Sequence, residues 1–157
     1  MKSTNAFRGL ALSLLAAAGL LQAATASAQV VASEGWTRAT VPGAKTGVGY
    51  LVLTNKGSDE ASLMVLTSSV SDKVQIHRST LDAQGVSRMW PVGYLKIQPG
   101  ESVRFDPSGL HLMFNDIKAP FVVGSKVPVR LIFEHESEIN IELEVRPLVP
   151  EAAAPPH

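Results

Sequence analysis

The chain has 157 residues with 14 basic and 14 acidic side chains, and it contains no cysteine. Balanced charge gives it no general attraction for nucleic acid or anionic lipid. The lack of cysteine excludes disulfide scaffolds, cysteine catalysis and the metal sites that need thiolate, such as zinc ribbons, iron–sulfur clusters and blue-copper centres. The length predicts one domain.

The first 28 residues match the pattern of a secretory signal peptide. Lys2 and Arg8 form a basic start, an apolar run continues to about Leu21, and Ala26-Ser27-Ala28 is a small-residue cleavage pattern. The run is too short for a membrane anchor, because a spanning helix needs ~20 apolar residues. Cleavage after Ala28 would leave a mature chain of 129 residues with 12 basic and 14 acidic side chains, which is not expected to insert into a membrane.

The remainder of the sequence predicts an all-β domain. Ten short segments rich in Val, Leu, Ile and Thr alternate with Gly-, Pro- and Asn-containing turns, and none shows a sustained 3.6-residue period. Many short strands at this spacing indicate a sandwich or small barrel. The predicted strands are 35–39, 48–55, 61–68, 73–79, 86–92, 95–97, 102–105, 110–115, 127–133 and 140–146. The Pro- and Ala-rich tail, 149–157, is predicted to be disordered.

One strand carries a pair of soft metal ligands. Successive side chains of a strand point to opposite faces, so Leu110, Leu112 and Phe114 are expected to face the core. His111 and Met113 then share the opposite, exposed face, about 7 Å apart along the strand. Imidazole and thioether together favour copper, above all Cu(I), over Zn, Mg or Ca.

Two further ligands are available on a predicted hairpin that turns near residues 82–85. His77 is expected to point away from the core because Val74 and Ile76 claim the core face of its strand. Met89 lies on the face opposite Trp90. The residues alone suggest, without establishing, that these side chains converge with His111 and Met113 on one ion.

The other methionine and histidines have plainer interpretations. Met64 lies inside an apolar segment and is predicted to fill space in the core. His135, between two glutamates at a strand end, is predicted to be solvated. His157 is the last residue, and is at most an auxiliary ligand.

At these residues the sequence resembles the periplasmic copper chaperones of the PCu(A)C family. Their motif is a His, about ten residues, a Met, twenty-one residues and His-x-Met, and here Met89 and His111-Leu112-Met113 are separated by twenty-one residues. The opening segments 36–40, 42–47 and 50–55, followed by 89–92, 99–101 and 109–113, are similar to the family in the same order. The resemblance covers roughly residues 31 to 145.

The resemblance implies a cupredoxin-like Greek-key β-sandwich or barrel over residues 29–148, in a periplasmic, non-enzymatic protein. It implies Cu(I) as the bound metal, with His77, Met89, His111 and Met113 as ligands. The expected function is a monomeric Cu(I) metallochaperone that delivers copper for cytochrome c oxidase assembly. Its partners would be membrane-anchored, copper-accepting assembly factors or cytochrome oxidase subunit II. The alternative is a periplasmic copper-buffering or resistance protein without a dedicated acceptor.

Two departures from the family pattern affect the site. Eleven residues separate His77 from Met89, one more than is usual, and an extra residue inside a strand would turn one ligand to the wrong face. The turn-like sequence at residues 82–85 favours the turn as its location, but His77 is the least secure ligand. The hairpin and tail also lack the additional methionines and histidines that family members often carry, which argues against a second, Cu(II)-type site.

Overall fold

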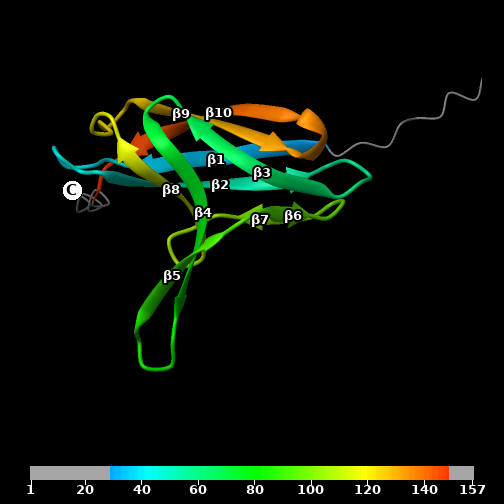
Figure 1. The fold of residues 1–157 in the computed structure, drawn as a ribbon, viewed down its shortest axis with the longest axis horizontal. Helices are drawn as coiled ribbons and strands as arrows, with labels where there is room; N and C mark the ends of the chain where they lie inside the picture. The colour runs from blue at the N-terminus through cyan, green and yellow to red at the C-terminus, as the bar shows by residue number, and fades with distance from the viewer. Residues whose placement is uncertain (1–28, 149–157) are drawn as a thin grey trace, which may run out of the picture.

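A computed structural model of the protein describes residues 29–148, and strands make up most of this range (Figure 1). The strands are β1 (Val30–Arg38), β2 (Thr46–Asn55), β3 (Ala61–Ser68), β4 (Ser71–Leu81), β5 (Ser87–Val92), β6 (Leu95–Ile97), β7 (Ser102–Arg104), β8 (Leu110–Ile117), β9 (Lys126–Phe133) and β10 (Glu138–Arg146). A short 3₁₀ helix, η1 (Glu134–Glu136), joins the last two. All ten predicted strands are present, with ends that differ by up to five residues. Within residues 29–148, no helix is long and apolar enough to cross a membrane.

Seven of the strands close into a barrel. They follow the order β4-β8-β2-β1-β10-β9-β3, and β3 pairs again with β4 to complete the ring. β1 and β10 run parallel, and the other neighbours in the ring run antiparallel. A closed barrel has no unpaired strand edge around its ring. The predicted all-β class is confirmed.

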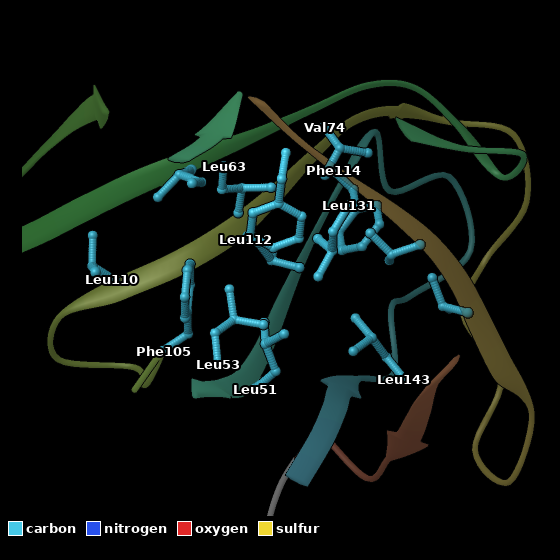
Figure 2. Packing of buried hydrophobic residues seen from close by; sticks show 14 of the residues in the cluster. Leu51, Leu53, Leu63, Val74, Phe105, Leu110, Leu112, Phe114, Leu131 and Leu143 are labelled. Atoms are coloured by element: carbon cyan, nitrogen blue, oxygen red, sulfur yellow. The ribbon is translucent and has the colours of Figure 1, made fainter. Parts of the chain in front are cut away.

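The core fills the interior of this barrel (Figure 2). Leu110, Leu112 and Phe114 of β8 are buried, as the strand alternation predicted, and Val74 and Ile76 of β4 are buried with them. Burying each such side chain contributes roughly 1.5–3 kcal/mol to stability. This packing fixes which face of β8 and β4 points inward, and therefore which face carries the histidines.

The inner face of β2 needs glycine at two positions. A Cβ added at Gly47 would lie 2.5 Å from a ring carbon of Phe121, and one at Gly49 would lie 2.7 Å from a methyl group of Leu143. Side-chain carbons do not approach this closely without displacement, because protein interiors are close-packed. The two glycines therefore let the large residues of the core approach the β2 backbone.

The β4–β5 hairpin projects away from the barrel (Figure 1). The pairing of β4 with β8 ends at Arg78, so beyond this residue β4 pairs only with β5. We call residues 78–90 the arm. Its turn is closed by Asp82, whose Oδ1 accepts the backbone N–H groups of Gln84 at 3.1 Å and Val86 at 2.8 Å. Gly85 takes the positive φ, 79°, that the turn requires.

Met64 does not belong to the core, so that prediction is wrong. The register of β3 against β9 shifts between Leu63 and Val65, which marks a bulge. Leu63 is fully buried, whereas Met64 and Val65 are both 47% exposed. Strict alternation would expose only one of two successive residues, but a bulge locally disrupts the ladder and with it the alternation.

Candidate metal site

The two histidines of the predicted site meet across neighbouring strands. His77 of β4 and His111 of β8 are directly opposite each other in the antiparallel register, so both side chains lie on the same face. Their ring centroids are 5.9 Å apart and the rings meet edge to face at 64°. The face they share is opposite the one that Leu112 and Ile76 bury in the core.

Met89 reaches the same place from β5. Its sulfur lies 3.1 Å from Nδ1 of His77, although the two residues are twelve positions apart in the sequence. β4 and β5 pair without a shift from Leu81–Ser87 to Ile76–Val92. The extra residue between His77 and Met89 therefore lies in the turn and not in a strand. His77, which the sequence left as the least secure of the four predicted ligands, is therefore in contact with Met89, another predicted ligand.

His111 is buried, and here the prediction of an exposed ring is wrong. Only 4% of its surface is accessible, although it points away from the barrel core as expected. Alternation identifies the face of a strand but does not say what lies across that face. In the structure the ring of His77 covers the His111 ring from one side. Nδ1 of His111 lies 3.3 Å from the carbonyl oxygen of Gly109.

Met113 lies on the same face of β8, two residues beyond His111. It is half-buried, and its register partners are Gln75 on β4 and Val48 on β2. Two residues of a strand span roughly 7 Å, which a flexible thioether side chain can cover. The structure thus brings His77, His111 and Met89 together and places Met113 beside them on the same sheet face.

The surroundings favour the neutral form of His77. Partial burial lowers the pKa of its imidazole below the usual 6.5, and the nearby charges of His111 and Lys73 lower it further. A neutral imidazole has a free lone pair, which is the form that binds a metal.

No hard-metal site competes with this group in the part of the chain that the structure describes. Residues 29–148 contain no group of three or more His, Cys, Asp or Glu side chains that could hold an ion. His135 lies exposed in η1, as predicted, and His157 falls outside the described residues. The candidate donors on β4, β5 and β8 are two imidazoles and two thioethers. Because thioether sulfur is a soft ligand, this combination suits Cu(I) better than Zn or Mg.

The contact between His111 and Gly109 was not predicted from the sequence. A signal for it exists, because the turn sequence Asp106-Pro107-Ser108-Gly109 stands directly before the strand that carries His111. The turn type alone does not show that a carbonyl oxygen will face the ring two residues later.

Sequence comparison gives one family and one curated relative. The model of the lipoprotein family described as LpqE-like matches residues 30–145. Lxx21020 of Leifsonia xyli subsp. xyli, named as a lipoprotein, is 29% identical over 118 residues, which cover 74% of this chain and 69% of the relative.

Structure comparison finds the same fold in PCuAC domains. The copper-bound PCuAC domain from PmoF2 has a TM-score of 0.63 and 23% identity, with 75% of this chain and 92% of that domain covered. The Cu(I) form of DR1885 from Deinococcus radiodurans has a TM-score of 0.60 and 22% identity, with 78% and 81% covered. At these identities the likeness shows the fold, and it is the cupredoxin-like β-barrel that the sequence resemblance implied.

Proposed function

Because the chain belongs to the LpqE-like family and has the fold of PCuAC domains, we propose that it is an exported copper chaperone that binds Cu(I). The observation that carries this proposal is the convergence of three soft or borderline donors from three strands. Nδ1 of His77 lies 3.1 Å from Sδ of Met89, and the ring of His111 lies against that of His77. Met113, on the same face, would supply the fourth donor.

The ligand types support Cu(I) as the cargo. Thioethers are soft ligands that bind Cu(I) well and Zn(II), Mg²⁺ or Ca²⁺ poorly. They also form no disulfides, which matters in the oxidising compartment that a signal peptide over residues 1–28 would lead to. We place the mature protein in the periplasm. Intact-mass spectrometry of a periplasmic fraction should give the mass of a chain that begins at Gln29.

The exposure of the four side chains supports a transfer role. Met89 is 52% exposed, whereas His111 is 4% exposed and His77 and Met113 lie between these limits. An incoming ligand can therefore approach the metal from the Met89 side and replace that thioether first. His111 would release the ion last. A site graded in this way allows stepwise exchange with an acceptor, which we take to be a component of cytochrome c oxidase assembly.

Metal titration of the mature protein tests the binding step. Under reducing conditions, with a coloured Cu(I) chelator as competitor, we expect one equivalent of Cu(I) or Ag(I) to be retained and Zn(II) to be lost. Retention of zinc as strong as that of Cu(I) would show that the methionines are not ligands and would refute the proposal.

The transfer step needs a separate measurement. A Cu(I)-loaded sample mixed with an apo copper-binding domain of a cytochrome oxidase subunit II should pass its metal on faster than free chelated Cu(I) does. If the protein binds Cu(I) tightly but transfers no faster than the chelator control, a copper-buffering role would replace the chaperone role.

A further inference from the structure

The turn before β8 is held closed by Asp106. Its backbone N–H donates to the carbonyl of Leu110 at 2.8 Å, and its own carbonyl accepts the N–H of Gly109 at 3.2 Å. Its side-chain Oδ1 accepts both the backbone N–H of Ser108 at 2.8 Å and the hydroxyl of Ser108 at 2.7 Å. Four hydrogen bonds around one residue define the path of the chain into Leu110 and His111.

This turn fixes the position of the Gly109 carbonyl. Its oxygen accepts the backbone N–H of Ser79 on β4 at 3.0 Å, and it also lies 3.3 Å from Nδ1 of His111. A carbonyl oxygen can only accept a hydrogen bond. A hydrogen bond at this position therefore requires the proton of a neutral His111 ring to be on Nδ1, which leaves the lone pair on Nε2.

We infer that His111 binds the metal through Nε2, and that Asp106 acts as a positioning residue by holding the Gly109 carbonyl against Nδ1 of the ring. The inference deepens the proposed function and rests on it for the identity of the metal. A ligand histidine commonly donates its second N–H to a carbonyl or carboxylate, which fixes the tautomer and the orientation of the ring.

Burial makes this contact more than incidental. With only 4% of His111 exposed, water has little access to replace a lost partner of the ring. An unpaired buried N–H costs about 1–3 kcal/mol, so the tautomer that keeps the Gly109 contact is favoured over the one that breaks it.

The two histidines would then use different nitrogen atoms. Within residues 29–148 the sulfur of Met89 is the polar atom that lies against the His77 ring, and the nitrogen that faces it is Nδ1. If His77 and Met89 share one ion, His77 binds through Nδ1 and carries its proton on Nε2. His111 has the opposite arrangement because the Gly109 carbonyl occupies its Nδ1 side.

Long-range ¹H–¹⁵N spectra of the apo protein at pH 8 test the tautomers without any metal. We expect the nitrogen shifts of His111 to report a protonated Nδ1 and an unprotonated Nε2. A His111 ring protonated on Nε2 would overturn the inference, whatever the variants below show.

The variants Asp106→Ala and Asp106→Asn separate positioning from simple loss of stability. Asn keeps an Oδ1 that can accept the two Ser108 bonds, so it should retain the tautomer and bind Cu(I) within about twofold of the parent. Ala removes both bonds, and we expect a mixture of His111 tautomers and a loss of Cu(I) affinity of about tenfold, at the lower end of the effect of ligand-orienting partners. Asp72→Ala is the charge-matched control, since it removes an exposed carboxylate that pairs with Lys118 at 3.5 Å and should change neither readout.

The outcomes distinguish this inference from the proposed function. A parent protein that shows the expected tautomer but retains no Cu(I) would refute the copper function and leave the Asp106 turn as the device that orients His111. A parent that binds Cu(I) while Asp106→Ala keeps both the tautomer and the affinity would refute the positioning role alone. If Asp106→Ala does not fold, a parent His111 ring protonated on Nε2, or an Asp106→Asn variant that keeps both Ser108 bonds but loses the Nδ1-protonated tautomer, would still overturn the inference.

Discussion

At the scale of single residues, two exposed methionines of this protein have opposite expected roles. Met89 is 52% exposed and Met64 is 47% exposed, so neither contributes much to the core. Only the sulfur of Met89 lies against a histidine nitrogen. Because its exposure is similar, Met64 is a better control for Met89 than a buried methionine would be.

We therefore expect Met89→Leu to weaken Cu(I) binding more than tenfold, which corresponds to about 1.4 kcal/mol or more. Met64→Leu should leave binding unchanged. Because both positions are exposed, both variants should unfold within about 0.5 kcal/mol of the parent. Chelator competition and thermal unfolding of the apo forms provide the two measurements. Equal Cu(I) affinity for the two variants would remove Met89 from the site, and Met113→Leu should follow Met89→Leu.

The pKa of His77 gives the apo protein a pH-dependent stability. Burial and the neighbouring charges of His111 and Lys73 lower this pKa in the folded state below the usual 6.5. As pH falls below about 6.5, the unfolded chain takes up a proton at this residue before the folded chain does. The free energy of unfolding should therefore decrease as pH falls from about 6.5 toward the lowered pKa of the folded state. Above about pH 6.5 the contribution of neutral His77 to stability is complete.

Denaturant titrations of the apo protein between pH 5 and pH 8 measure this effect. His77→Asn, which has no titratable ring, should show a smaller loss of stability on acidification than the parent does. An identical pH dependence in both proteins would show that His77 is not desolvated in the folded state.

At the scale of elements, the β4–β5 pairing decides whether the ligands face each other. Ser79 is directly opposite Met89, and His77 is directly opposite Pro91, so both ligands lie on one face of the hairpin. Side chains alternate along a strand, so one added residue has very different consequences in the turn and in the strand.

A glycine inserted between Gln84 and Gly85 should lengthen the turn, keep the register and leave Cu(I) affinity within about threefold of the parent. A glycine inserted between Met89 and Trp90 should shift Met89 by one position relative to His77 and reduce the affinity more than tenfold. The pair is measured by the same chelator competition. If the strand insertion is tolerated as well as the turn insertion, the arm register does not hold the site together.

At the scale of the whole molecule, the barrel core packs against the inner faces of β4 and β8 and so holds in place the two strands that carry His77 and His111. Gly49 lies where β2 meets Leu143 and Phe114, and an added Cβ would be 2.7 Å and 3.1 Å from their side chains. Gly49→Ala should therefore destabilise the apo protein by about 1–3 kcal/mol, the usual cost of overpacking a core.

Gly93→Ala is the matched control, because a Cβ there would meet nothing within 4 Å. Thermal unfolding of the apo forms should show a lower Tm for Gly49→Ala and little change for Gly93→Ala. Unchanged stability in Gly49→Ala would mean that the core around Phe114 has room that its close contacts do not suggest.

The all-β class, the ten strands and the two faces of β8 could all be predicted from the amino-acid sequence. Each of these depends on local pattern, since a two-residue period specifies which side chains share a face whatever lies across from them. Leu110, Leu112 and Phe114 are buried together, and His111 and Met113 lie on the other face, as the alternation required. The turn-like residues 82–85 also indicated that the additional residue between His77 and Met89 lies in the turn, and the unshifted pairing of β4 with β5 agrees with this.

Which of these side chains are exposed, and which of them lie in contact, depends on how distant strands pack together. His111 is buried because His77, from a strand thirty-four residues earlier, lies against its ring, and no local pattern contains that contact. Met64 is exposed because β3 forms a bulge against β9, a partner more than sixty residues away. Exposure and convergence arise between strands that are distant in sequence, and the closed barrel that brings those strands together is a property of the whole chain.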